Sequence, residues 1–280
     1  MAQPAPHRTI VFSHANSFPA GTYRALFERW EAAGYTVRAI EQYGHDPRYP
    51  VTHNWPHLVT QLHDFVSEAI GHPVFLVGHS LGGYLSLMLA NRYPQWAQGV
   101  VVMDSPILDG WRSAALGLAK RARLIDRIMP SRVAARRTHE WPSLHAAQTH
   151  FSSKSKFAAF HPRVLHDYLA YGLTHTSDAS GYHLRYRRDV EAAIYSTLPH
   201  RLLAEFARHP HHCPLAFIAG THSRELRRGG LRGARQLVGT NLSWVHGTHL
   251  YPFEAPEPTA DEVLRWLDHF GQQRAQVPRD

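Results

Sequence analysis

The sequence predicts an α/β fold, built on a mostly parallel sheet of about six strands that is flanked by helices. Short, unbroken apolar runs alternate along the chain with longer segments in which apolar residues recur every three or four positions. Buried strands and amphipathic helices have these two patterns. Their alternation favours parallel strands, because each helix returns the chain to the same edge of the sheet. With 280 residues, 44% of them hydrophobic, the chain is long enough for one large core.

The expected elements follow one another with few gaps in the first and last parts of the chain. Strands are expected at 9–14, 35–40, 73–77, 99–103, 214–220 and 242–246. Helices are expected at 22–33, 56–70, 81–93, 225–237 and 259–270. Gly34 is suited to a helix end and Pro56 to a helix start, which supports two of these boundaries.

One turn stands out as a candidate for chemistry. The apolar run at 73–77 ends in Gly78-His79-Ser80-Leu81-Gly82, and helical spacing begins at once. A G-x-S-x-G turn between a strand and a helix is a nucleophile elbow, which exposes the serine hydroxyl on a sharp corner. Glycines suit the flanking positions, because side chains there would collide across so tight a turn. Ser80 is therefore the candidate nucleophile.

With this strand, turn and helix in place, the chain resembles the α/β-hydrolase superfamily from about Thr9 to about Gly271. The resemblance implies a serine hydrolase of the esterase type. Because only eight residues precede the first strand, the two leading strands of the superfamily's sheet are expected to be absent. The superfamily carries a helical cap after the strand that ends here at Met103. No strand pattern is seen at 107–212, so we expect a core formed by 1–106 and 213–280 and a helical cap formed by 107–212.

A serine hydroxyl needs an adjacent base to act as a nucleophile, and His249 is the candidate. It lies in the segment 247–257, between the last strand and the last helix, which resembles the superfamily's histidine loop. His246 is a local competitor but falls on the strand end. His79, inside the elbow, is expected to pack behind the nucleophile.

The acidic member of the triad is less clearly marked. The superfamily most often places an Asp after the strand expected here at 214–220, and this chain has Ser223 at that position. Some lipases and haloalkane dehalogenases instead carry the acid after the strand that follows the elbow helix, which corresponds to Asp104. A carboxylate there could orient the imidazole and stabilise the imidazolium. Asp104 is the favoured acid, with Glu225, Asp109 or the absence of an acid as alternatives.

The resemblance also implies an oxyanion hole made of two backbone N–H groups. Leu81, the residue after the nucleophile, should supply one of them. In the loop after the first strand, His14-Ala15-Asn16 occupies the place of the superfamily's His-Gly-x. Asn16 is therefore the expected second donor, and its side-chain amide could add a third hydrogen bond. Ser17 is the next choice.

These residues favour a cofactor-independent serine hydrolase that cleaves a carboxylic ester or a related acyl bond. Carbon–carbon bond hydrolysis or acyl transfer could use the same triad, and a catalytically silent hydrolase fold that binds a partner is a further alternative. The expected substrate is a small acyl compound with an apolar group, because the expected cap is rich in aromatic residues. These are Trp111, Trp141, Phe151, Phe157, Phe160, Tyr168 and Tyr171.

The composition bears on partners and compartment. The net charge is +8 with 23 neutral histidines, but no nucleic-acid-binding motif accompanies it. Many of the basic residues lie at 111–140, where they fit either the solvated faces of cap helices or a lid that attracts acidic substrates. His211-His212-Cys213 are contiguous and are expected to be structural, so no metal site is expected. With one cysteine, no signal-peptide core at 1–8 and no apolar run of membrane-spanning length, the expectation is a cytoplasmic protein of unknown oligomeric state.

Overall fold

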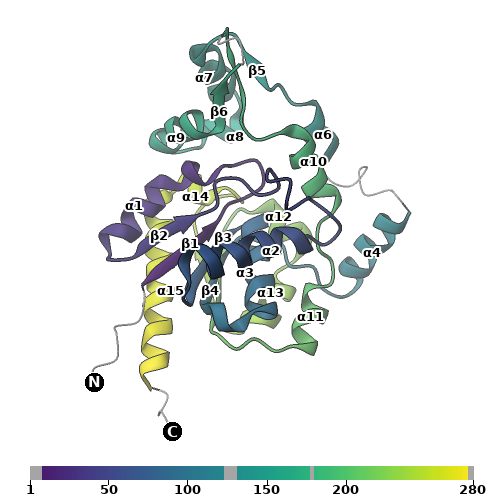
Figure 1. Cartoon of the computed structure of the whole chain (residues 1–280), viewed down its shortest axis with the longest axis vertical. Coiled ribbons are helices and arrows are strands. Elements are labelled where there is room, and N and C mark those ends of the chain that lie inside the picture. The colour runs from purple at the N-terminus through teal and green to yellow at the C-terminus, as the bar shows by residue number, and fades with distance from the viewer. Residues whose placement is uncertain (1–7, 123–130, 177–179, 277–280) are drawn as a thin grey trace.

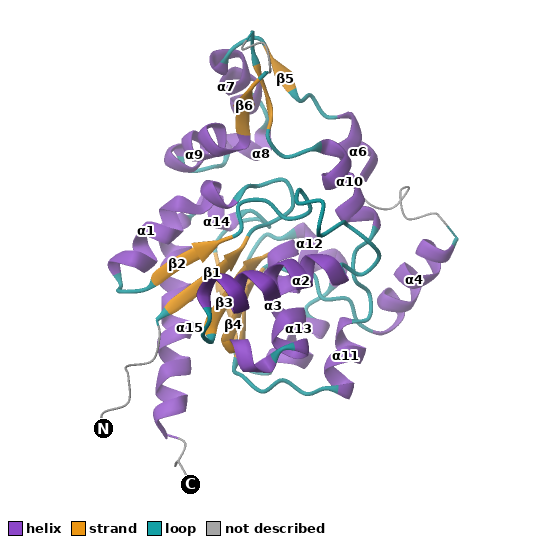
Figure 2. Cartoon of the chain, in the orientation of Figure 1, coloured by secondary structure: helices purple, strands orange, loops and turns teal. Residues whose placement is uncertain are grey.

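The computed structural model describes residues 8–122, 131–176 and 180–276. Its central sheet has six strands in the order β2-β1-β3-β4-β8-β9, and every neighbouring pair is parallel. The strands are β1 (Thr9–Ser13), β2 (Thr36–Ala39), β3 (Val74–His79), β4 (Ala97–Met103), β8 (Leu215–Gly220) and β9 (Leu242–Val245). Figure 2 shows them as one twisted sheet. The predicted parallel sheet of six strands is thus confirmed, and each strand lies within a few residues of its expected place.

Alternate residues of the strands face two hydrophobic cores, one on each side of the sheet. Ile10 and Phe12 pack on one side with α1 and α15, whereas Val11 packs on the other side with α2, α3 and α13. The sheet helices are α1 (Arg24–Ala32), α2 (Pro56–Asp64), α3 (Leu81–Arg92), α13 (Arg232–Val238) and α15 (Pro256–Gln276). A sheet covered on both faces needs strands that are apolar throughout, which explains the unbroken apolar runs.

Four predicted helices differ in detail. The first is preceded by a 3-10 turn, η1 (Ala20–Tyr23). The helix expected at 225–237 is divided into α12 (Arg224–Gly229) and α13, because Gly230 adopts φ +81° and breaks the helical path. The last helix, α15, extends beyond the expected range of 259–270 at both ends. The helix expected at 56–70 consists of α2 followed by a π-helical turn, η2 (Phe65–Ile70).

The segment 107–212 was expected to contain no strand, and this expectation is wrong. It holds a small antiparallel sheet in the order β5-β7-β6, at the top of the molecule in Figure 1. Its strands have two or three residues each, too few to show an alternating pattern. The elements are α4 (Gly110–Arg121), α6 (Ser131–Arg136), β5 (Glu140–Trp141), α7 (Leu144–Ser152), α8 (Ser155–Ala158), α9 (Pro162–Gly172), β6 (Leu173–His175), β7 (Tyr182–Leu184), α10 (Arg188–Ser196) and α11 (Leu202–Arg208).

Parts of this segment lie in different places. The elements from α6 to α10 lie above the central sheet in Figure 1. An aromatic cluster joins them to the core, because Phe18 of the loop after β1 packs against Phe160, Tyr168 and Phe253. In contrast, α11 contacts α3 and α13 of the core. Of the aromatic residues expected in the cap, Trp111 is 72% exposed on α4.

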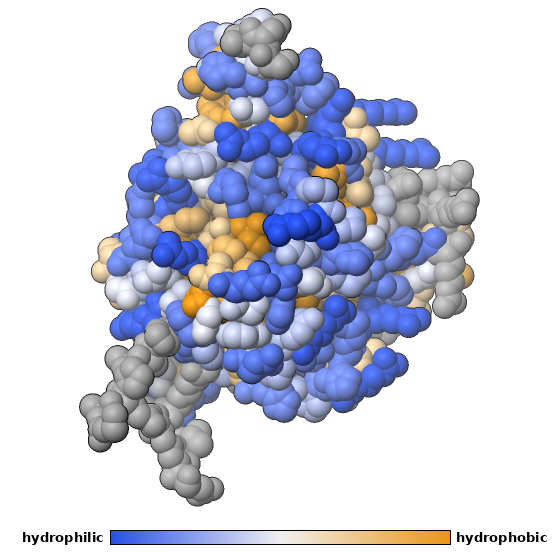
Figure 3. Space-filling model, in the orientation of Figure 1, coloured by the Kyte–Doolittle hydropathy of each residue, from blue (hydrophilic) through white to orange (hydrophobic). Residues whose placement is uncertain are grey.

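Hydrophilic side chains cover most of the face drawn in Figure 3. Within the described residues, no helix is both long enough and apolar enough to cross a membrane. Part of the basic stretch at 111–140, namely 123–130, lies outside the described residues.

Candidate active site

The turn between β3 and α3 has the strained geometry of a nucleophile elbow. Ser80 adopts φ 54° and ψ −110°, a combination that residues other than glycine rarely adopt. A side chain at Gly78 would place its Cβ 2.2 Å from the Gly82 carbonyl oxygen, and one at Gly82 would lie 1.9 Å from that of Ser13. The flanking glycines are therefore required by close backbone contacts. They allow the strand to reverse into the helix with Ser80 at the corner.

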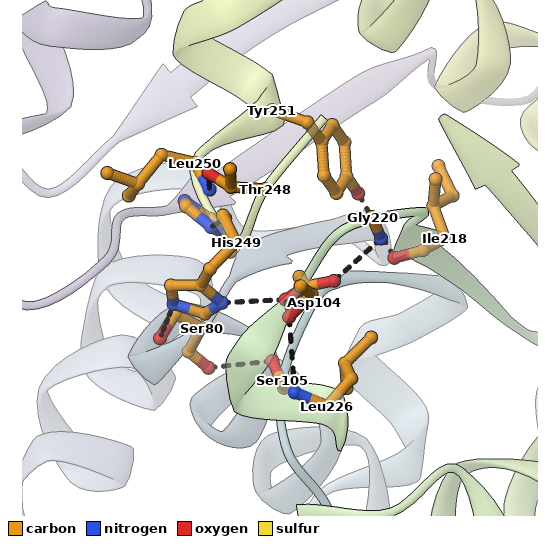
Figure 4. Close-up of polar contacts among 12 residues, drawn as sticks. Ser80, Asp104, Ser105, Ile218, Gly220, Leu226, Thr248, His249, Leu250 and Tyr251 are labelled. Atoms are coloured by element: carbon orange, nitrogen blue, oxygen red, sulfur yellow. Dashed lines mark hydrogen bonds and ion pairs between the residues drawn. The ribbon is translucent and has the colours of Figure 1, made fainter. Parts of the chain in front are cut away.

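The structure brings Ser80, His249 and Asp104 into one hydrogen-bonded chain (Figure 4). His249 Nε2 lies 3.0 Å from Ser80 Oγ, and His249 Nδ1 lies 2.7 Å from Asp104 Oδ2. The three residues follow β3, β9 and β4, whose carboxyl ends meet at one edge of the parallel sheet. Because the carboxylate accepts from Nδ1–H, Nε2 is left free to accept the serine proton.

Asp104 is fully buried and receives two further hydrogen bonds. Gly220 N–H donates to Oδ1 at 2.7 Å, and Ser223 Oγ donates to Oδ2 at 2.6 Å. Ser223 is also the N-cap of α12, where its oxygen accepts from Leu226 N–H at 3.1 Å. Ser223, the residue that stands where the superfamily's acid was expected, therefore binds the acid that comes from the neighbouring strand.

The alternative acids lie elsewhere. Asp109 forms ion pairs with Arg112 and Arg232, at 3.5 and 3.6 Å. Glu225 is exposed on α12 and forms no ion pair with His249 within the described chain. Of the acids considered, Asp104 alone contacts the imidazole.

The loop after β1 leaves two backbone N–H groups without an acceptor among the described residues. Ala15 N–H donates to Tyr23 Oη at 3.1 Å and Phe18 N–H donates to Ala15 O at 3.1 Å, but Ser17 N–H forms no such bond. Asn16 N–H has no acceptor among the residues that the structure describes. The hydrogen bonds therefore leave both Asn16 and Ser17 as candidates for the oxyanion donor.

Two further groups were expected to donate to the oxyanion, the Leu81 N–H and the Asn16 side-chain amide, and they differ in whether they already have an acceptor. Leu81 is the first residue of α3, so its N–H has no acceptor within that helix. The side-chain amide of Asn16 was suggested as a third donor, but Asn16 Nδ2 donates to Glu191 O at 3.0 Å. The amide thus fixes the loop to α10.

His79 packs behind the nucleophile, as the sequence predicts, and links three loops. Its Nε2 lies 2.8 Å from His249 O, and its Nδ1 lies 2.7 Å from Tyr23 Oη. Burial, and then the charge of His249, lower the pKa of His79 well below its usual value. The ring is therefore neutral, so Nε2–H donates to the carbonyl and Tyr23 O–H donates to Nδ1. The sequence alone contains no local signal for this role of Tyr23.

The histidine loop is held from its other side by Glu254. Its carboxylate accepts from Thr248 N–H at 2.8 Å and from the Thr248 hydroxyl. Gly247 adopts φ 141° at the start of the loop, and a Cβ there would lie 2.6 Å from Glu254 Oε2. These contacts fix the backbone that immediately precedes His249.

Two cavities lie away from these residues. One, of about 420 Å³, is lined by residues of α6, β7 and α10, and another, of about 520 Å³, is lined by residues of α7, α9, β6 and β7. Neither is lined by Ser80, Asp104 or His249, so the chemistry rather than the cavity size locates the candidate site. Within 8–122, 131–176 and 180–276, no group of three His, Cys, Asp or Glu residues is arranged to hold a metal ion.

Comparison with protein families agrees with this architecture. Residues 4–177 match the family model described as "Serine aminopeptidase, S33", which covers more than half of the chain. The chain belongs to this family of α/β-hydrolases. Its resemblance to the superfamily is thereby confirmed.

Similar proteins and structures fall in the same superfamily. The chain is 25% identical to mouse monoglyceride lipase (Mus musculus) over 137 residues, 45% of this chain and 44% of that protein. It is also 25% identical to a monoacylglycerol lipase of Mycolicibacterium smegmatis, over 45% of this chain and 47% of that protein. The chain thus spans about half the length of these relatives.

Solved structures match over more of the chain. E-2-(acetamidomethylene)succinate hydrolase matches with a TM-score of 0.72 at 19% identity, over 93% of this chain and 91% of that one. A thioesterase domain from the curacin biosynthetic pathway matches with a TM-score of 0.69 at 16% identity, over 92% and 91%. At these identities the structural similarity shows the α/β-hydrolase fold.

Proposed function

We propose that the protein is a serine hydrolase that cleaves a carboxylic ester or a related acyl bond through Ser80, His249 and Asp104. The observation that carries this proposal is the continuous hydrogen-bond chain from Ser80 Oγ through His249 to the buried carboxylate of Asp104. A serine on a strained elbow with an oriented base is the arrangement that activates a hydroxyl for attack.

In the first half of the reaction, Ser80 Oγ attacks the acyl carbonyl carbon while His249 Nε2 takes its proton. The Asp104 carboxylate stabilises the imidazolium that forms. The N–H groups of Leu81 and Asn16 stabilise the negative oxygen of the tetrahedral intermediate. The carbon–oxygen bond to the leaving group then breaks, and His249 donates the proton to the departing alcohol. Ser80 is left as an acyl ester.

In the second half, His249 removes a proton from a water molecule as the water attacks the acyl carbonyl. The tetrahedral intermediate collapses, and the bond to Ser80 Oγ breaks as His249 returns a proton to that oxygen. The products are a carboxylic acid and the free enzyme, so no cofactor is consumed.

We also propose that the elements above the sheet act as a cap over the catalytic residues, within the segment 107–212 predicted from sequence. Their position in Figure 1 and the aromatic contacts of Phe18 with Phe160 and Tyr168 support this role. The names of the similar monoglyceride lipases support an ester with an apolar part as the substrate. On this proposal α11, which contacts the core helices, belongs to the core.

A second candidate reaction is suggested by the family description, which names a peptidase. Cleavage of a peptide bond would use the same residues, with His249 donating its proton to an amine. The two reactions are separated by comparing 4-nitrophenyl acyl esters with aminoacyl 4-nitroanilides. Ester hydrolysis is expected, and turnover of the anilides alone would replace it with the peptidase assignment.

A fluorophosphonate probe tests the proposal directly, because it reacts with an activated serine. We expect covalent labelling of the protein and no labelling of Ser80→Ala. Ser86→Ala is the control, since Ser86 is a fully buried serine on α3, the helix that follows Ser80. A folded wild-type protein that neither reacts with the probe nor hydrolyses 4-nitrophenyl esters of any chain length would instead be a catalytically silent binding protein.

A further inference from the structure

Lys156 reaches from α8 towards the loop that carries the proposed oxyanion donor. Its Nζ lies 5.0 Å from the ring centroid of Phe18 and 6.0 Å from that of Phe157. Phe18 follows Asn16 by two residues, and its N–H closes the turn onto Ala15 O. The ammonium group therefore lies beside the loop that carries Asn16, the proposed oxyanion donor.

The ammonium group of Lys156 forms no ion pair within the part of the chain that the structure describes. Among the described residues, no carboxylate lies within 4.0 Å of its ammonium and no hydrogen bond to it is formed. The nearby Glu191 is already paired with Arg137, with Glu191 Oε2 2.8 Å from Arg137 Nη1. Of these three charged groups, Lys156 is the one left uncompensated.

Lys156 is exposed, so its ammonium group is accessible to a ligand from solvent. Its Nζ lies near the aromatic rings of Phe18 and Phe157, and desolvation by neighbouring atoms lowers its pKa, an effect that Glu191 and Glu225 oppose. Its charge also contributes to the lowered pKa of His79, whose ring centroid is 5.1 Å from that of His249. An accessible ammonium that has no ion pair among the described residues can bind a carboxylate through a charge-assisted hydrogen bond.

We propose that Lys156 binds a carboxylate of the substrate, so that the preferred substrates are esters that carry a carboxylate on a short apolar chain. This inference rests on the proposed function and names its substrate class. One ammonium balances the single charge of a carboxylate, and Arg137 is not free to complete a phosphate site because Glu191 holds it. The same positive charge disfavours the free α-ammonium group that an aminopeptidase must accept.

The test compares two esters that differ in charge. The mono-4-nitrophenyl ester of adipic acid carries a terminal carboxylate, and 4-nitrophenyl hexanoate is a neutral ester of similar length. Lys156→Met should lower kcat/KM for the adipate half-ester by about tenfold or more, mainly through KM, and change that for the hexanoate by less than about threefold. Lys156→Arg should retain the preference for the half-ester, and Lys156→Glu should reverse it.

Lys154→Met is the matched control, because Lys154 is an exposed cation on the same short segment. It should leave both esters unaffected. If Lys156→Met changes both esters equally, or neither, the carboxylate site is excluded. The rate of fluorophosphonate labelling checks that each variant keeps an intact nucleophile.

A binding experiment separates this inference from the proposed function. Calorimetry with Ser80→Ala protein compares monomethyl adipate with methyl hexanoate in the absence of turnover. Tighter binding of the adipate, lost on adding Lys156→Met, supports the carboxylate site even if neither nitrophenyl ester is hydrolysed. Equal binding of the two compounds overturns it, whatever the enzyme hydrolyses.

Discussion

At the scale of single residues, the most constrained charge in the candidate site is that of Asp104. Its carboxylate has no exposed surface, and a buried charge is unfavourable unless donors replace the lost water. Gly220 N–H, the Ser223 hydroxyl and His249 Nδ1–H supply those donors. By fixing the carboxylate, Gly220 N–H and the Ser223 hydroxyl also fix the imidazole ring of His249, which the carboxylate orients.

Replacing Asp104 by Asn should therefore leave the site assembled but largely inactive. The Asn amide can donate to His249 Nδ1, which favours the wrong imidazole tautomer, and in a comparable triad this change lowers kcat by about 10⁴-fold. We expect a loss of about 10³-fold or more in ester hydrolysis. Glu225→Gln is the control and should retain kcat within about threefold. The reverse ranking of the two variants would assign the acid to Glu225.

At the scale of elements, a buried hydrogen-bond relay joins the loops that follow β1, β3 and β9. Ala15 N–H donates to Tyr23, Tyr23 donates to His79, and His79 donates to the backbone of His249. The relay places the proposed oxyanion loop, the nucleophile and the base in one network. Tyr23 therefore acts as a positioning residue that does not touch the substrate.

Tyr23→Phe tests this role, because it removes the central hydroxyl and keeps the ring. We expect kcat to fall by about tenfold to a hundredfold, since small displacements of reacting groups are costly. Tyr43→Phe is a matched control, because Tyr43 is also fully buried and its hydroxyl lies 2.8 Å from Ser13 Oγ. Both variants should lose similar thermal stability, about 1–3 kcal/mol. Equal kcat values for the two would reduce Tyr23 to a structural residue.

At the scale of the whole molecule, the chain is basic, yet two of its histidines are buried in neutral form. Burial lowers the pKa of His14 to about 4 and that of His79 well below its usual value. His14 Nε2 accepts from Tyr43 N–H at 3.0 Å, and His14 Nδ1 donates to Ala15 O at 2.8 Å. Both rings lie behind the catalytic loops, so their protonation would disturb the site as well as the core.

The folded protein should therefore lose stability in mild acid. A histidine with a lowered pKa binds its proton more readily in the unfolded chain, so its contribution is complete above pH 6.5 and falls as the pH drops towards 4. For His14, a pKa change from 6.5 to about 4 corresponds to about 3 kcal/mol.

Urea unfolding between pH 7 and pH 4.5 measures this loss. His14→Gln keeps a donor and an acceptor but cannot titrate, so the free energy of unfolding of this variant should fall less steeply with pH than that of the wild type. Parallel pH profiles for the two proteins would show that His14 does not contribute.

Some of the elements were harder to predict than others. The four inner strands, β1, β3, β4 and β8, were predictable because each is a largely apolar run that is buried on both faces. The edge strands β2 and β9 are partly exposed. In contrast, β5, β6 and β7 are stabilised by pairing between segments distant in sequence and are too short to show a pattern. The break at Gly230 was missed because a glycine pair such as Gly229-Gly230 can also lie within a continuous helix, as Gly82-Gly83 does in α3.

The candidate site was predictable to the extent that chemistry lies in local motifs. Gly78 to Gly82 and the loop around His249 each contain enough neighbouring residues to be identified alone. The acid was ambiguous because β4 and β8 are neighbours, so a carboxylate after either strand can reach the same imidazole. The roles of Tyr23, Ser223 and Lys156 depend on contacts between distant segments that no local pattern encodes.

The sequence by itself determined the class of fold, the elbow and the identity of the nucleophile and base candidates, because these depend on periodicity and on short-range backbone geometry. Only the tertiary structure decided which acid contacts His249, which N–H groups remain available near Ser80 and which cation faces the proposed substrate space. Those choices depend on distances between loops at the ends of different strands, and these distances are set by how the whole chain packs.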